Sequence, residues 1–319
     1  MTPGVFEFLK RPLVVALLAI LVLLLGGEIL SPGFASPRQI VTLLTIAALL
    51  GVVSAGQNLV ILSGHEGIDL SVGSIISFSA FLAGNVMQRS DANLLQALAL
   101  ALGAAFLIGL VSGIGVTLLR IPPLVMTLGM LGVVQGGLVL LTRGVPSGGA
   151  APLLSRLVTE PVFLGLPGIV FIWIGVGLVV ELLLRRTSFG FKVYAIGANE
   201  AAAGLAGVPV RMTRAFVFGL SGFFSGLTGV LLLGYTSNVF IGAGDQYILP
   251  SIIAVVIGGT SLAGGSGTYV GTMAGAVFLV LLQSILTTLS IPPFGRQVIY
   301  GVTLLGLMLI YGRQRRLKG

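Results

Sequence analysis

The sequence predicts an all-α integral membrane protein with about ten transmembrane helices. Of its 319 residues, 56% are hydrophobic and only 8% are charged, whereas a soluble domain usually carries about 25% charged residues. The mean hydropathy is +1.12. Apolar runs of about 18 residues or more recur along the whole chain, each long enough for a helix to cross a bilayer and unlike the alternating pattern of an outer-membrane barrel. We therefore expect a helical bundle in a lipid bilayer.

Clusters of Gly, Pro and charged residues divide the apolar runs into the expected spans. The first run has a basic flank but no small-residue cleavage site, so it is expected to remain as the first helix. No soluble domain is inserted, and residues 1–319 are expected to form a single transmembrane domain. The spans are expected near 12–30, 39–63, 70–88, 94–118, 123–142, 167–184, 213–234, 247–262, 268–289 and 297–312.

The net charge of +8 could indicate nucleic-acid binding, but the basic residues are distributed as a membrane protein requires. An even number of spans places both termini on one side. With the termini in the cytoplasm, twelve Lys and Arg residues fall inside and five fall outside, which satisfies the positive-inside rule. Nucleic acid is therefore not an expected partner. The inner set is Lys10, Arg11, Arg120, Arg185, Arg186, Lys192, Arg211, Arg214, Arg313, Arg315, Arg316 and Lys318, and the outer set is Arg38, Arg89, Arg143, Arg156 and Arg296.

Two connections between spans are longer than the rest. Residues 142–168 are expected on the outer side of the membrane; they are rich in Pro and Gly, contain the amphipathic stretch "LLSRLV", and are available to an external partner. Residues 185–214 are expected in the cytoplasm, where a second partner would dock. Lys192, Arg211 and Arg214 in this cytoplasmic loop are expected at the level of the lipid headgroups.

A short helix is predicted inside the cytoplasmic loop, from about Glu200 to Ala206. Asn199 is expected as its N-cap and Gly207 as its end, because Asn caps free backbone N–H groups and Gly tolerates the left-handed conformation that stops a helix. Its small, Ala-rich surface would fit a groove on a partner. The alternative is an ordinary amphipathic helix at the membrane surface.

Glycines recur at helical spacing in two of the spans. Gly267, Gly271 and Gly275 lie four residues apart, and a second stripe runs through "FGLSGFFSGLTGVL". Each stripe is expected on one helical face, where small residues let neighbouring backbones approach closely.

No nucleotide site is expected in this chain. A phosphate-binding P-loop requires GxxxxGK[ST], and none of the three lysines, Lys10, Lys192 and Lys318, lies in such a context. Zero cysteines exclude thiolate chemistry and Cys-based metal sites. We expect no catalytic, cofactor-binding or metal-binding residues, so any ATP that powers the protein is hydrolysed by another chain.

The single histidine and two carboxylates gather in "ILSGHEGIDLSVGS", between two apolar runs. His65 and Glu66 are expected to be solvated at the interface, since a metal site would need more ligands. Asp69 has two open interpretations: an N-cap of the following helix, or part of a solute path. The stretch "SAGQN" (54–58) interrupts the preceding span, so a broken helix pair around a protein-lined cavity is the alternative to an interfacial position.

Other polar residues inside the spans are candidates for lining a path for a hydroxyl-rich solute. This set of expected pathway or gating residues is Asp69, Ser71, Gln57, Asn58 and Gln135.

Three segments of the chain stand out as a set: "GIDLSVGS" (67–74), "GANEAAAGLAGV" (197–208) and "AVVIGGTSLAGGSGTYVGTMAGA" (254–276). In sequence, order and spacing they resemble the hallmark segments of ribose/xylose-type permease subunits of bacterial ATP-binding-cassette (ABC) importers. The similarity runs from about residue 12 to 312. Branched-chain amino-acid permeases are related, but tend to read "INFAHGE"-like where this chain has "IDLSVGS".

The resemblance implies a type II ABC importer-like bundle with broken or short helices in the bacterial inner membrane. It implies a permease dimer, of identical or paralogous chains, with two ATPase subunits that bind ATP and Mg on the cytoplasmic side. A periplasmic binding protein would deliver a monosaccharide or related sugar. The residues that resemble the family's coupling motif are Asn199, Glu200, Ala201, Ala202 and Gly207, although Gly207 lies one residue farther from Glu200 than in importers at large.

Two alternatives come from other classes of protein. One is a secondary transporter driven by H⁺ or Na⁺, which requires a buried titratable relay, and Asp69 is its only candidate. The other is a membrane scaffold or channel that associates with other subunits. An ABC permease for a non-sugar solute such as a branched-chain amino acid also stays open.

Overall fold

The computed structural model describes residues 12–64 and 66–316. Its helices and two short strands, in chain order, are α2 (Pro12–Leu30), α3 (Pro37–Leu62), α4 (Val72–Met87), η1 (Asp91–Asn93), α5 (Leu94–Thr117), α6 (Pro123–Thr142), α7 (Pro152–Thr159), β1 (Pro161–Phe163), β2 (Leu166–Pro167), α8 (Gly168–Arg186), α9 (Ser188–Ala198), α10 (Glu200–Leu205), α11 (Val210–Thr236), η2 (Asp245–Tyr247), α12 (Ile248–Ile257), α13 (Tyr269–Thr288) and α14 (Pro293–Arg316). A helix occupies each of the ten expected spans.

Seven of the described helices, namely α2, α3, α5 (with η1), α6, α8, α11 and α13, are long and apolar enough to cross a membrane. The prediction of an all-α, multi-pass membrane protein is therefore confirmed. The helices α4, with 16 residues, and α12, with 10, are short; at about 1.5 Å per residue neither reaches the roughly 30 Å of a hydrocarbon core. The total number of crossings and the side on which the termini lie stay predictions.

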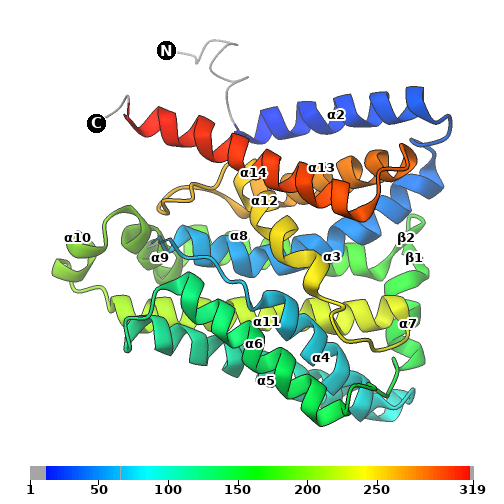
Figure 1. Ribbon diagram of the computed structural model, residues 1–319, viewed down its shortest axis with the longest axis horizontal. Coiled ribbons are helices and arrows are strands. Elements are labelled where there is room, and N and C mark those ends of the chain that lie inside the picture. The colour runs from blue at the N-terminus through cyan, green and yellow to red at the C-terminus, as the bar shows by residue number, and fades with distance from the viewer. Residues whose placement is uncertain (1–11, 65, 317–319) are drawn as a thin grey trace.

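The long helices run roughly along one direction, which gives the bundle two ends (Figure 1). The helices α9 and α10 lie at one end, and α7 with the antiparallel β1–β2 hairpin lies at the other. The two long connections of the sequence therefore face opposite ways. We call these the α10 end and the α7 end.

The helices α3 and α11 form the centre of the bundle. In their apolar windows 67% and 78% of the residues are buried, against 11% for α2 and 17% for α6. The centre contains many serines and threonines, and several of their hydroxyls donate to carbonyls one turn earlier, as Ser54 does to Leu50 and Thr228 to Phe224. The polarity of these hydroxyls is satisfied within their own helix, as an apolar environment requires.

The glycine stripe of α11 packs against α5. A methyl group added at Gly222 would overlap the carbonyl oxygen of Ala105, and one added at Gly109 would overlap that of Phe218. Backbones can therefore approach closely only because both helices lack side chains at these positions.

The prediction for the second glycine stripe is partly wrong. The helix α13 begins at Tyr269, with Thr268 as its N-cap, so Gly267 lies in the preceding loop and not on the helical face. Its backbone has φ +148°, and a side chain there would meet Thr260. Only Gly271 and Gly275 lie on α13, where they face the backbone of α12 at Gly258 and Ala254.

Candidate functional site

The short helix predicted in the 185–214 loop is present as α10, at one end of the bundle (Figure 1). Asn199 is its N-cap, and its side-chain oxygen accepts a 3.0 Å hydrogen bond from the N–H of Ala202. Gly207 follows the last turn with φ +81°. Ala201 and Ala202 are exposed on the helix surface. The local prediction of cap, helix and stop is confirmed, whereas the coupling role of these residues stays a prediction.

An ion pair connects α10 to the centre of the bundle. The guanidinium of Arg214, on the second turn of α11, donates to both carboxylate oxygens of Glu200, at 3.2 and 2.8 Å. Its Nη2 atom also donates to the carbonyl oxygen of Ser63, at 3.4 Å, where α3 ends. One side chain therefore joins the first residue of α10 to the ends of two central helices.

The level of Arg214 relative to the lipid headgroups stays a prediction, but its side chain is buried within the protein. Its side chain is only 6% exposed, whereas that of Glu200 is 45% exposed. A buried cation requires a counter-charge and hydrogen-bond acceptors, and Glu200 and Ser63 supply them.

Four glycines from three separate parts of the chain meet near the start of α10: one lies in the last turn of α9 and three lie in loops. We call Gly64, Gly197, Gly264 and Gly265 the glycine junction. A methyl group at Gly64 would lie 3.0 Å from the Cα of Gly197, and one at Gly264 would lie 2.5 Å from the Cα of Gly64. The N–H of Gly265 donates to the carbonyl oxygen of Leu62 at 3.0 Å. The junction thus brings together two of the segments that resemble hallmark motifs, 197–208 and 254–276, with Gly64, which lies three residues before the third.

Replacing Gly197 with alanine is expected to lower the unfolding temperature of the purified protein in detergent. The added methyl group would overlap the carbonyl oxygen of Leu62 and the nitrogen of Gly265, and backbone atoms cannot move aside as a flexible side chain can. Gly204→Ala is the matched control, because nothing lies within 4 Å of its added methyl group and alanine favours a helix by about 1 kcal/mol over glycine. Equal unfolding temperatures for the two variants would refute the close contact.

Residues 63–64 and 66–71 are the described part of the connection between α3 and α4, called here the 63–71 segment. They lead from the α10 end into the bundle and are joined to α11 at two points. Arg214 holds Ser63, and the hydroxyl of Ser221 donates to Asp69 at 2.7 Å. The two fastening residues are seven positions apart, so they lie on the same face of α11, about 10 Å along its axis. Thr127 of α6 adds a third bond, from its hydroxyl to the carbonyl oxygen of Ile68, at 3.2 Å.

Asp69 is fully buried, and its carboxylate accepts three hydrogen bonds. They come from the N–H of Ser71 at 3.0 Å, from the hydroxyl of Ser71 at 2.5 Å and from Ser221. With its amide oriented to match these neighbours, Gln57 donates to the backbone oxygen of Asp69 and accepts from its N–H, both at 3.2 Å. The carboxylate therefore joins the 63–71 segment to α11.

The N-cap interpretation of Asp69 is confirmed in part. The assigned N-cap of α4 is Ser71, whose side chain makes no capping bond, but the carboxylate of Asp69, two residues earlier, accepts the N–H of Ser71 at the start of the helix. The alternative of a break at "SAGQN" is wrong, because α3 runs unbroken from Pro37 to Leu62. Glu66 is exposed as expected, and the expectation for His65 falls on a residue outside the described ranges.

The remaining polar candidates occupy different environments. Asn58 is fully buried and its amide donates to the hydroxyls of Thr260 and Thr272, at 2.8 and 2.9 Å. It thus joins α3 to the loop before α13 and to α13 itself. Ser71 is buried beside Asp69, whereas Gln135 is only partly buried on α6. The structure does not bring these five residues together around one cavity, and their role in a path stays a prediction.

Sequence reasoning missed the partners of these groups. In the sequence, Ser221 lies within a glycine stripe, and Thr260 and Thr272 lie within a glycine-rich motif. Nothing in their local sequence indicates that their hydroxyls meet buried polar groups. Their separations from Asp69 and Asn58 exceed 150 residues.

Comparisons with known proteins identify the group to which the chain is similar. The family model for "Branched-chain amino acid transport system / permease component" matches residues 39–311. Ribose import permease protein RbsC of Bacillus subtilis (strain 168) is 34% identical over 295 residues, which cover 92% of this chain and 90% of that protein. Autoinducer 2 import system permease protein LsrC of Salmonella paratyphi B is 34% identical over 300 residues, covering 94% and 86%.

Ribose import permease protein RbsC of Escherichia coli (strain K12) is also 34% identical, over 306 residues that cover 94% of each chain. No solved structure matches the chain. The matched range extends from α3 to α14 and includes α10, the glycine junction and the 63–71 segment. The chain therefore belongs to the family of branched-chain amino acid transport system permease components.

Proposed function

We propose that this chain is the membrane-spanning permease subunit of an ABC importer that takes up a monosaccharide or related sugar. The family is one of permease components, and the similar proteins named above import ribose or autoinducer 2. Similarity over more than nine-tenths of this chain supports a common role. The names of these relatives favour a sugar over the branched-chain amino acid of the family description.

The observation that carries the proposal is the position of α10. The helix projects from one end of the bundle, is capped at both ends, and is joined to the bundle centre by Glu200 and Arg214. Apolar side chains are exposed around it: Leu205 is 92% exposed, Met212 76% and Phe191 73%. Such residues on a surface that would face the cytoplasm favour contact with another protein. Two ATPase subunits, which would bind ATP and Mg, are the proposed partners here.

The α7 end would face the periplasm under the positive-inside rule. The 142–168 connection, with α7 and the β1–β2 hairpin, lies at this end (Figure 1). We propose this end as the surface on which a sugar-loaded binding protein docks. A second permease subunit, identical or paralogous, would complete the path, and the exposed apolar side chains of α6, such as Leu128, Val133 and Leu140, are available to it or to lipid.

The proposed mechanism involves no covalent chemistry in this chain. Closure of the ATPase pair would push on α10, and the Glu200–Arg214 pair and the glycine junction would pass this displacement to the 63–71 segment. The helices held by that segment, α3, α4, α6 and α11, would then shift between outward-open and inward-open arrangements. ATP, binding protein and sugar drive the cycle only through their different affinities for the two arrangements.

Replacing Leu205 with glutamate tests the docking surface. We expect retention of the ATPase partner during purification to fall about tenfold or more, because burying an unpaired charge at an interface costs more than the roughly 1.4 kcal/mol that corresponds to this factor. Leu164→Glu is the matched control: Leu164 is 80% exposed but lies in the hairpin at the opposite end. Full retention of the ATPase by the Leu205 variant would remove α10 as the docking element.

Sugar uptake by cells that contain the whole transport system tests the function itself. The cells are given a panel of radiolabelled sugars that includes D-ribose, and uptake of at least one of them is expected to require the ATPase subunit. This uptake should persist when the proton and sodium gradients are dissipated while ATP is maintained. Uptake that stops when the gradients are dissipated would support the ion-driven alternative. In the structure the carboxylate of Asp69, the candidate for that alternative, is already engaged by three hydrogen-bond donors.

A further inference from the structure

A polar hollow lies between α12, α13 and α14 in the half of the bundle toward the α7 end. Its volume is about 280 Å³, close to the lower end of the range of about 300–1,000 Å³ that holds small-molecule ligands. Two helix ends lie near the hollow: α13 ends at Thr288, and α14 begins at Pro293. A space of this size and position would admit a small solute from outside.

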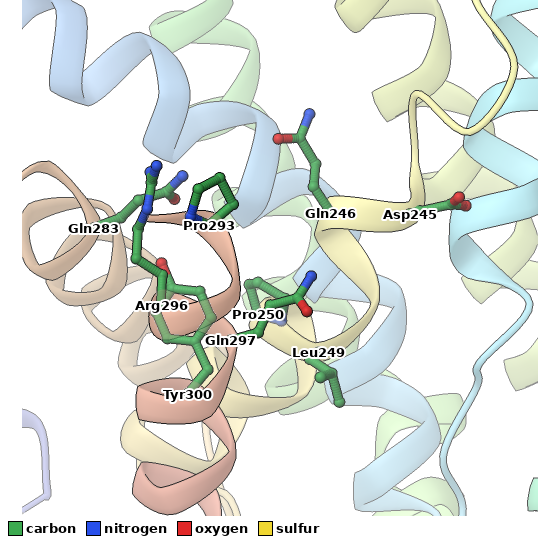
Figure 2. A pocket seen from close by; sticks show the side chains of 9 residues that line it. All are labelled: Asp245, Gln246, Leu249, Pro250, Gln283, Pro293, Arg296, Gln297 and Tyr300. Carbon is green, nitrogen blue, oxygen red and sulfur yellow. The ribbon is translucent and has the colours of Figure 1, made fainter. Parts of the chain in front are cut away.

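The walls of the hollow combine amide and guanidinium groups with apolar surface. Gln246, Gln283, Arg296 and Gln297 supply the polar groups. In Figure 2, Gln283 and Arg296 lie side by side at one edge and Gln297 lies beside Pro250. Asp245 also borders the hollow, but its carboxylate points away from the other side chains (Figure 2).

Most of this hydrogen-bonding capacity is not used within the protein. Within residues 12–64 and 66–316, the amides of Gln283 and Gln297 make no hydrogen bond. Gln246 makes only a long one, 3.5 Å, to the carbonyl oxygen of Ala243. Arg296 is held by one bond from Nη1 to the hydroxyl of Thr287, at 2.9 Å, and its Nε atom is buried without a partner in the described chain. Polar groups left unpaired in or near a bilayer are costly unless they meet water or a ligand.

The composition of the hollow matches one class of solute. Planar amides offer a donor and an acceptor side by side, and a guanidinium offers several donors, so together they can meet neighbouring hydroxyl groups. The apolar surfaces of Leu249 and Pro250 can cover the C–H face of the same molecule. Apolar exposed side chains follow in the next turns of α14, at Val298, Val302 and Leu305.

The geometry points to a solute-contact site in this hollow, for a neutral polyhydroxylated molecule of monosaccharide size, with Gln283, Arg296 and Gln297 as its principal contacts. The permease would thus take part in recognising the solute after its release from the binding protein, as well as providing a path. This inference rests on the proposed sugar import and specifies where in the chain the sugar is held.

The absence of cysteine from the chain makes the hollow directly testable. Gln297→Cys is expressed in cells with the complete transport system, and a membrane-impermeant maleimide is added from outside. We expect the cysteine at position 297 to react with the maleimide. D-ribose, or another panel sugar that the wild type takes up, is then added at ten times its dissociation constant. By mass action, the reaction rate is expected to fall about tenfold. Gln88→Cys and Gln96→Cys are the matched controls, because both residues are exposed near the α7 end and outside the hollow.

A second variant separates contact from general shielding by a docked binding protein. Gln283→Leu is expected to raise the apparent KM for sugar uptake about tenfold, the effect of losing paired hydrogen bonds to a bound solute, with unchanged maximal rate and unchanged permease level. Gln96→Leu should change neither. Three results would overturn the inference in cells whose wild-type permease takes up sugar. Position 297 could be unreactive, or sugar could protect it no more than it protects position 88. Alternatively, Gln283→Leu could leave the apparent KM unchanged. If the wild type takes up no sugar in the panel, the proposed function itself fails and the inference fails with it.

Discussion

Replacing Glu200 with arginine is expected to abolish sugar uptake and also to destabilise the protein. Glu200 supplies the counter-charge for the buried guanidinium of Arg214, so the variant would place a second cation against it. Hydrogen bonds to charged groups contribute about 1.5–3 kcal/mol each. Because the side chain of Glu200 is 45% exposed, the free energy of unfolding is expected to fall by less than the roughly 3–5 kcal/mol that breaking a fully buried pair costs. Thermal unfolding in detergent and uptake in cells measure the two effects.

Arg214→Met separates coupling from stability, because the two partners of the pair differ in burial. Removing one partner of a buried ion pair is costly when it leaves a buried charge, but the side chain of Glu200 is 45% exposed. Water therefore solvates the remaining carboxylate, and methionine fills the buried space without a charge. The link from α10 to Ser63 is nevertheless cut. We expect near-normal unfolding but a loss of sugar-stimulated ATP hydrolysis in the assembled transporter.

Arg211→Met is the matched control for this pair of experiments. Arg211 lies three residues earlier on the same helix and is exposed, so its loss removes a positive charge from the same surface without touching Glu200. The double change Glu200→Arg with Arg214→Glu should recover part of the lost stability. Coupled ATP hydrolysis that survives Arg214→Met would show that the pair only stabilises the fold.

The membrane spans could be predicted because each depends on local composition. The range 123–142 expected for one span matches α6, and the expected cap and stop of α10 match because Asn199 and Gly207 act within their own turn of chain. The span expected at 247–262 ends earlier, at Ile257, because Gly258 and the residues after it form a loop. Local signals thus located the elements and missed some of their ends.

The polar contacts of the site could not be predicted because they join distant parts of the chain. A broken helix pair at "SAGQN" was one of the two alternatives for this region, but α3 is continuous. Asn58 donates to Thr260 and Thr272, and Gln57 pairs with the backbone of Asp69. Arg214 was expected at the surface because basic residues usually reach the headgroups. Its burial depends on Glu200, fourteen residues away, and the folded arrangement of α10 against α11 brings them together.

Replacing Asp69 with leucine is expected to prevent stable folding. The change leaves the N–H and hydroxyl of Ser71 and the hydroxyl of Ser221 without their shared acceptor in a fully buried site. Each unmet buried donor costs about 1–3 kcal/mol, although the two hydroxyls can rotate toward other acceptors. The Ser71 N–H cannot. The yield of monodisperse protein and its unfolding temperature in detergent measure the loss.

Asp69→Asn distinguishes a fastening role from a role in the solute path or its gate. The amide oxygen can still accept from Ser71, and the rotating hydroxyl of Ser221 can accept from the amide N–H₂ instead of donating. If Asp69 fastens the 63–71 segment to α11, this variant keeps its fold and its uptake. Ser221→Ala should lower stability by about 1 kcal/mol, whereas Ser225→Ala, one turn later, should not, because Ser225 donates only to the carbonyl oxygen of Ser221 in its own helix. A well-folded Asp69→Asn variant without uptake would instead show that the negative charge itself is needed for transport.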